Sequence, residues 1–360
     1  MKKDWFRWIL DSKLFLFILI VFFITFLIVL FFINIYVFLS IYVPLLAVLI
    51  IIFLIFLLSF KTLFVSRKKK DFIGTNTMLL ITVLFITFFF ILFGYILVKS
   101  VFILQTYSLS EILLSSDWNP EYNKFGLYPI IIVTIIVTGI ALLIAVPISI
   151  FSAIYITEYA PRKIRKTIRP FIDVLAGVPS VVYGLAAFLF LVPLVKDFIA
   201  PFFGVESTGS CIFTAAITLA VMVFPIIISL CIESFDAIPI SLREASLSIG
   251  ATRWETVKKV LFRASAPNLI SAVLLGFGRA FGETIAVSMV IGGIPRIPAT
   301  IFGPGQTLAS LIVSAYSEMM SVPLYESALM MVTLILFIVV LIFNVLGFII
   351  LRRTKRKWKI

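Results

Sequence analysis

Long apolar segments with few charges restrict the possible folds of this chain more than any other feature. Several windows of more than 18 predominantly apolar residues occur, the length that crosses a hydrocarbon core of about 30 Å. Of the 360 residues, 62% are hydrophobic and 13% are charged, so too little polar side chain is present to cover a globular surface. Alternating ten-residue segments, which are typical of membrane β-barrels, are absent. We therefore predict an all-α, polytopic integral membrane protein.

Eight membrane-spanning helices are expected from the positions of these apolar segments. Their approximate ranges are 14–33, 37–59, 77–98, 128–150, 173–194, 211–232, 267–293 and 326–350. Residues 14–60 form almost one apolar run, which only Asn34 and Pro44 interrupt. A tight hairpin near Asn34 is the preferred interpretation of this run, and one long span followed by a re-entrant segment is the alternative.

The distribution of basic residues supports this arrangement of spans. If the N-terminus lies in the cytoplasm, 25 of the 30 Lys and Arg residues fall in cytoplasmic segments, as the positive-inside rule requires. Both termini are therefore expected in the cytoplasm of a bacterial-type inner membrane. The net charge of +13 is explained by this orientation signal, and no nucleic-acid partner is expected. The chain has no His, which argues against an intramembrane enzyme, and we expect no cofactor and no metal site.

Two domains are expected. Residues 1–70 are predicted to form a two-helix membrane extension that ends in a basic linker, Arg67-Lys68-Lys69-Lys70. The apolar run at the N-terminus offers no small-residue cleavage site, so it is interpreted as an uncleaved anchor. Residues 71–360 are predicted to form the main transmembrane domain.

The segment 233–266 is a long polar stretch that has the signals of a helix–turn–helix. Ser241 and Glu244 have the spacing of a capping box, and so do Thr252 and Glu255. Gly250 lies where a left-handed residue would end the first helix. These signals predict a defined shape, whereas a solvated amphipathic loop is the simpler alternative.

Within this segment, Glu244-Ala245-Ser246 followed by Gly250 resembles the EAA loop of ABC importer permeases. The resemblance implies that this EAA-like loop (233–266) docks on a cytoplasmic ABC ATPase dimer, with Glu244, Ala245, Gly250 and Arg253 as coupling residues. Phe262-Arg263 replaces the Leu-Pro of the family motif, a departure that affects the end of the second helix. The chain has no Gly followed by Lys and so no phosphate-binding P-loop. We therefore expect ATP hydrolysis on a separate chain.

The span 267–293 carries Arg279 and Glu283 near its middle. Charges at this depth are costly and usually functional, and residues four apart share a helical face. A guanidinium suits a tetrahedral oxyanion because it donates two parallel hydrogen bonds. The pair therefore predicts an anion path, and a purely structural ion pair is the alternative.

The segment 171–184 is predicted to contain a helix break, because Pro179 removes a backbone donor and disfavours a helical Val178. Broken helices of this kind often form transporter sites, although a simple proline kink is an equal alternative. Together with the charged span, this break gives the expected substrate path: Arg279, Glu283, Thr284, Pro179 and Ser180.

Three further stretches narrow the resemblance to phosphate ABC permeases of the PstC type. They are Trp118-Asn119-Pro120 with Phe125 to Pro129, Leu175 to Gly184, and Gly278 to Val287. The resemblance covers residues 77–350 and implies a type I ABC importer permease core. It also implies four partners: inorganic phosphate, a PstA-like second permease, the ATPase dimer and an extracytoplasmic phosphate-binding protein. A permease for another oxyanion, such as sulfate or molybdate, and a non-transporting membrane sensor or scaffold remain the alternatives.

Overall fold

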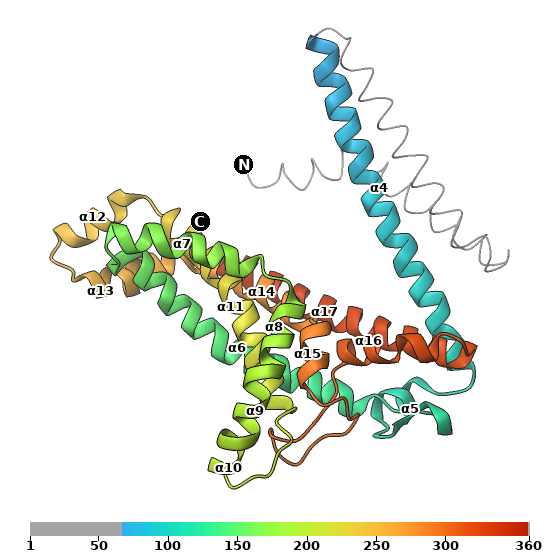
Figure 1. The fold of residues 1–360 in the computed structure, drawn as a ribbon. Coiled ribbons are helices and arrows are strands. Elements are labelled where there is room, and N and C mark those ends of the chain that lie inside the picture. Colours follow the sequence, from blue (N-terminus) through green and yellow to red (C-terminus); the bar gives the residue numbers. More distant parts are fainter. Residues whose placement is uncertain (1–66, 359–360) are drawn as a thin grey trace. The chain divides into compact units, whose positions relative to one another are not determined.

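The computed structural model describes residues 67–358 of the chain (Figure 1). Contacts between Cα atoms divide the chain into two units, Met1–Lys99 and Ser100–Ile360. The predicted spans 14–33 and 37–59, and most of the predicted domain 1–70, lie outside the described residues. The domain boundary expected after residue 70 therefore stays a prediction.

Helix α4 is a single helix of 35 residues, Arg67–Val101. The basic residues at its start are thus helical, where the sequence suggested a linker. The other helices up to the middle of the chain are η1 (Phe102–Gln105), α5 (Leu109–Leu114), η2 (Pro120–Tyr122), α6 (Tyr128–Ile154), η3 (Tyr155–Tyr159), α7 (Arg162–Ala176) and α8 (Ser180–Ala186). Two short strands, β1 (Trp118–Asn119) and β2 (Lys124–Phe125), pair antiparallel as a small hairpin.

The second half of the chain is also helical. Its helices are η4 (Ala187–Leu191), α9 (Val192–Leu194), η5 (Val195–Ile199), α10 (Ala200–Phe202), α11 (Ile212–Asp236), α12 (Ile240–Ser248), α13 (Arg253–Thr256), η6 (Val257–Leu261), α14 (Phe262–Phe281), α15 (Ile285–Val290), α16 (Leu308–Met319) and α17 (Pro323–Trp358). Four of the labelled segments, η3, η4, η5 and η6, are π-helical, and such turns are frequent at functional sites.

Six helices within the described residues are long and apolar enough to cross a membrane. They are Met78–Gln105, Tyr128–Tyr159, Ser180–Phe202, Ile212–Asp236, Arg253–Phe281 and Pro323–Thr354. Each corresponds to a predicted span, which confirms the all-α, polytopic membrane class. Two ranges needed correction: the span expected at 173–194 begins at Ser180, and the span expected at 267–293 ends at Phe281.

Helix α11 forms the centre of the second unit. Of its most apolar stretch, 67% is buried, and it packs between α6 and α14 (Figure 1). Small residues such as Ala215, Ala216 and Ala220 lie on its buried surface. Small side chains let helix backbones approach closely in a membrane, where burial of apolar side chains gives little driving force between helices.

A second apolar cluster joins η1, α5 and the start of α6 to α16 and α17. Two hydrogen bonds from distant parts of the chain tie it together. The Ile103 backbone N–H donates to Ser327 Oγ at 2.8 Å, and the Leu308 N–H donates to Thr134 Oγ1 at 2.9 Å. Helix α16 has 12 residues and is too short to cross the membrane, so it packs beside α17 as an accessory helix (Figure 1).

Candidate functional site

A break separates α7 from α8 at the place that Pro179 predicts. Helix α7 ends at Ala176, Pro179 adopts an extended conformation (φ −58°, ψ 140°), and Ser180 begins α8. Across this break, Tyr183 Oη donates a hydrogen bond to the Leu175 carbonyl oxygen at 2.8 Å. That bond joins the last turn of α7 to the first turn of α8. The predicted break is confirmed, and Tyr183 is the residue that holds its two sides together.

A second break separates α14 from α15. Helix α14 ends at Phe281, and Gly282 is its C-cap. The Glu283 carboxylate then accepts a hydrogen bond from the Ala286 backbone N–H at 3.1 Å, at the start of α15. Arg279 therefore lies in the last turn of its helix, and its predicted position at the middle of a continuous span was wrong. The physical reason is that Gly282 ends α14, while Thr284 is the N-cap of α15 and the Glu283 carboxylate accepts an N–H from its first turn.

This break also separates Arg279 from Glu283. The expectation that they share a helical face required an uninterrupted helix between them. Among the described residues no ion pair joins the two, because the Glu283 carboxylate serves the backbone of α15 instead. Arg279 is exposed and Glu283 is half-buried. The N–H groups of the Arg279 guanidinium are thus available to donate hydrogen bonds to an oxyanion.

The two breaks lie close together, because α8 packs against α15 (Figure 1). Gly184 is buried at this contact, where an added Cβ would be 2.8 Å from Ala286 Cα. The fold therefore gathers the segments of Pro179 and Ser180 and of Arg279, Glu283 and Thr284 into one region, although the sequence separates them by about 100 residues.

The EAA-like loop adopts the predicted helix–turn–helix. Helix α12 ends at Ser248, Gly250 has φ +87° in the left-handed region, and Thr252 and Glu255 form a capping box at the start of α13. Ser246 Oγ and Thr256 Oγ1 share a buried hydrogen bond of 3.0 Å that joins the two helices. The other predicted cap was wrong: Pro239 is the N-cap of α12, so Ser241 lies inside the first turn. A proline at this boundary sets the start of the helix without a side-chain cap.

The predicted coupling residues Glu244, Ala245, Gly250 and Arg253 are all exposed. Large apolar side chains are exposed beside them: Ile249 is 85% exposed and Ile240 is 69% exposed. Exposed apolar side chains on an otherwise polar loop are typical of a surface that contacts another protein.

Sequence reasoning missed two ion-pair groups near this loop. Arg243 pairs with Glu158 at 2.9 Å, and Asp236 pairs with both Arg165 and Arg169. The sequence signal for both was weak, because the partners are 67 to 85 residues apart and each basic residue fits equally well as an orientation signal.

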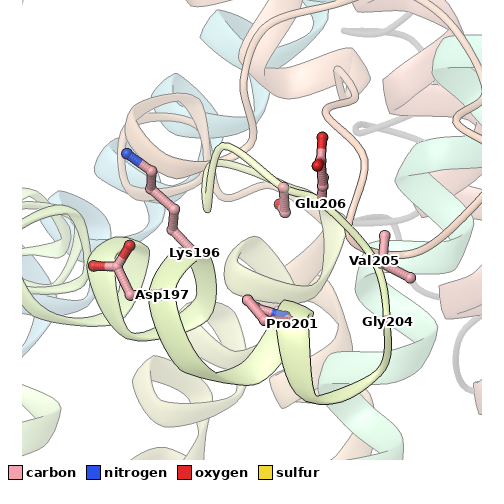
Figure 2. A pocket seen from close by; sticks show the side chains of 7 residues that line it. Lys196, Asp197, Pro201, Gly204, Val205 and Glu206 are labelled. Carbon is pink, nitrogen blue, oxygen red and sulfur yellow. The ribbon is translucent and has the colours of Figure 1, made fainter.

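A pocket of about 360 Å³ lies away from both breaks, around α10 and the segment that follows it. Figure 2 shows Lys196 and Asp197 on one side and Glu206 on the other. Two carboxylates beside one ammonium group do not favour an anion. The pocket is therefore a poor candidate for the oxyanion site that the sequence predicts.

Comparisons with known proteins agree with this geometry. Residues 145–359, which include both breaks and the EAA-like loop, match the profile of the family described as "Binding-protein-dependent transport system inner membrane component". The chain is 37% identical over 257 residues to the phosphate transport system permease protein PstC of Xylella fastidiosa (strain Temecula1), covering 68% of this chain and 79% of that protein. It is 41% identical over 213 residues to the probable ABC transporter permease protein YqgH of Bacillus subtilis, covering 59% and 67%.

A solved structure supports the same fold. It is a bacterial ABC transporter involved in the import of alginate, with a TM-score of 0.54 and 16% identity, covering 80% of this chain and 99% of that chain. At this identity the likeness concerns the fold alone. The profile match, the relatives and the fold give one conclusion: this chain belongs to the family of binding-protein-dependent transport system inner membrane components.

Proposed function

We propose that this chain is the permease subunit of an ATP-driven importer of inorganic phosphate. One observation carries the proposal: Arg279 is exposed at a helix break and has no ion-pair partner among the described residues. The similarity to PstC of Xylella fastidiosa supports phosphate as the anion. A guanidinium that no carboxylate neutralises is available to a tetrahedral oxyanion, which it binds through two parallel N–H groups.

In this proposal the region between the two breaks forms the substrate path. Arg279 binds phosphate, and Thr284, Pro179 and Ser180 line the path next to it. Glu283 holds the start of α15, and its carboxylate accepts a hydrogen bond from a protonated oxygen of the substrate. Broken helices of this kind often form the binding sites of transporters, which supports this placement of the path.

The EAA-like loop is proposed to dock on a separate ATPase dimer. Glu244, Ala245, Gly250 and Arg253 lie on its exposed surface, next to the exposed Ile249 side chain. Closure of the ATPase would move α12 and α13 together, because the Ser246–Thr256 hydrogen bond joins them. ATP hydrolysis thus belongs to the partner, and this chain transmits its motion.

Membership of the family supports the remaining proposed partners. A PstA-like permease completes the path, and an extracytoplasmic binding protein delivers phosphate. The EAA-like loop and both termini then lie on the cytoplasmic side of a bacterial-type inner membrane, in agreement with the positions of the basic residues.

The test is uptake of radiolabelled phosphate into proteoliposomes that contain the chain, the second permease, the ATPase and the binding protein. We expect ATP-dependent uptake by the wild type and loss of uptake in Arg279→Ala. Excess unlabelled phosphate is expected to compete, whereas sulfate and molybdate are not. Competition by sulfate or molybdate alone would reassign the substrate, and undiminished uptake by Arg279→Ala would remove Arg279 from the path.

A further inference from the structure

The Arg243 side chain donates four hydrogen bonds. Its Nε and Nη2 atoms donate to Glu158 Oε1 at 3.2 and 2.9 Å. Its Nη1 atom donates to the Ile238 carbonyl oxygen at 2.7 Å, and Nη2 donates also to the Phe235 carbonyl oxygen at 2.8 Å. The side chains of Arg243 and Glu158 are only 18% and 16% exposed. Partial burial strengthens such a pair, because solvent screens it less.

These bonds join three separate helical elements. Arg243 lies on α12 of the EAA-like loop, Phe235 lies near the end of α11, and Glu158 lies in η3, which directly continues α6. Within the described residues, no other side chain of α12 forms a hydrogen bond or an ion pair with a residue outside 233–266. Among the side chains of α12, Arg243 thus provides the polar connection to the other helices, through Glu158 of η3 and the Phe235 carbonyl group of α11.

Through Glu158, this connection continues into α6. Helix α6 is 27 residues long, which corresponds to about 40 Å at 1.5 Å per residue. At its other end, Thr134 Oγ1 accepts the Leu308 N–H at the start of α16, and its middle packs along α11. Because the far end of α6 is bonded to the start of α16, a displacement of η3 can be carried along α6 to α16.

We propose that Arg243 and Glu158 are positioning residues that transmit the motion of the EAA-like loop to α6. This inference rests on the proposed function, in which an ATPase moves the loop. When α12 moves, the two hydrogen bonds from Arg243 to Glu158 pull η3 and α6 with it. The hydrogen bonds from Arg243 to the Phe235 and Ile238 carbonyl groups keep the end of α11 and the turn that follows it attached to α12. Loss of the pair leaves the exposed docking surface intact but removes the ionic connection between α12 and α6.

The test measures ATP hydrolysis and phosphate uptake in the same reconstituted complex. In Glu158→Gln the amide oxygen still accepts a hydrogen bond, but the ionic attraction is lost. We expect this variant to assemble with the ATPase and to hydrolyse ATP near the wild-type rate. The phosphate taken up per ATP hydrolysed is expected to fall about tenfold, within the range of coupling changes that follow from single positions. Arg243→Ala is expected to lower this ratio further.

Lys163→Ala provides the matched control. Lys163 is exposed on α7 and forms no ion pair among the described residues, so both rates should equal those of the wild type. Arg243→Ala also removes the side-chain hydrogen bonds to the Phe235 and Ile238 carbonyl groups, so Glu158→Gln decides the question if Arg243→Ala does not assemble. An unchanged ratio in Glu158→Gln, or a parallel fall of both rates, overturns the inference. A wild-type complex that hydrolyses ATP but imports no phosphate overturns the proposed function instead.

Discussion

Gly184 of α8 lies directly against Ala286 of α15. A Cβ atom added to Gly184 would be 2.8 Å from Ala286 Cα and 2.8 Å from Met289 Sδ, closer than nonbonded carbon and sulfur atoms approach. This contact fixes how α8 packs on α15. Each of these helices begins directly after one of the two breaks. The proximity of the two predicted path segments therefore depends on a residue without a side chain.

We predict that Gly184→Ala disrupts this contact. The methyl group meets a backbone atom, which cannot move aside as a flexible side chain can, so α8 and α15 must separate. Overpacking of this kind costs about 1–3 kcal/mol, and we expect both a lower melting temperature of the purified complex and reduced phosphate uptake.

Gly139→Ala is the control for that prediction. Gly139 also lies within a long helix, α6, but no atom lies within 4 Å of its added Cβ. Alanine in a helix is more stable than glycine by roughly 0.5–1 kcal/mol, so this variant should melt at or slightly above the wild-type temperature. Equal behaviour of the two variants would mean that the α8–α15 contact is loose in the assembled transporter.

A second prediction concerns the turn of the EAA-like loop. Gly250 has φ +87° and nothing lies within 4 Å of its added Cβ, so a substitution there is disfavoured by the backbone and not by crowding. A left-handed conformation costs roughly 1–2 kcal/mol for a residue other than glycine. Gly250→Val should therefore distort the angle between α12 and α13 and reduce co-purification of the ATPase.

Gly250→Asn separates the backbone effect from a loss of side-chain contacts. Asn adopts the left-handed region more readily than other residues, so this variant should retain most ATPase binding despite its larger side chain. If Asn and Val reduce co-purification equally, then the docked ATPase contacts Gly250 directly, and the turn conformation is not the cause.

Local signals in the sequence predicted the local features of the fold. Pro179 predicts the break before α8, and Gly250 and the Thr252–Glu255 box predict the turn in the loop, because each acts through the backbone of its immediate neighbours. The Arg279–Glu283 pairing was wrong because the spacing argument assumed a continuous helix. Gly282, the C-cap of α14, interrupts the helix between these two residues.

Contacts between distant segments were not predictable in this way. Glu158 and Arg243 are 85 residues apart, and either one alone is an ordinary charge in a polar loop. Their pairing depends on how the ends of α6 and α11 meet, which is decided by packing along the buried face of α11. The contact between Gly184 and Ala286 was not predictable either, because nothing in the sequence around one of them indicates that the other lies against it.

A third prediction tests the geometry of the Arg279 site. Lys keeps the positive charge of Arg but donates from a single ammonium group, so it cannot form two parallel hydrogen bonds to one oxyanion. We expect Arg279→Lys to retain a small fraction of phosphate uptake and Arg279→Ala to retain none. Uptake by Arg279→Lys equal to that of the wild type would mean that only the charge attracts the anion and that its geometry is irrelevant.

The last prediction separates the two roles of Glu283. Its carboxylate accepts the Ala286 N–H at 3.1 Å, and a Gln side chain at this position can accept the same bond through its amide oxygen. Glu283→Gln should therefore melt close to the wild-type temperature, whereas Glu283→Ala loses the cap at a cost of about 1 kcal/mol. If Glu283 also contacts the substrate, phosphate uptake falls in both variants; if it only caps α15, Glu283→Gln transports normally while Glu283→Ala does not. Thermal unfolding and uptake measured on the same three preparations distinguish these outcomes, because the Gln variant changes the charge while it preserves the cap.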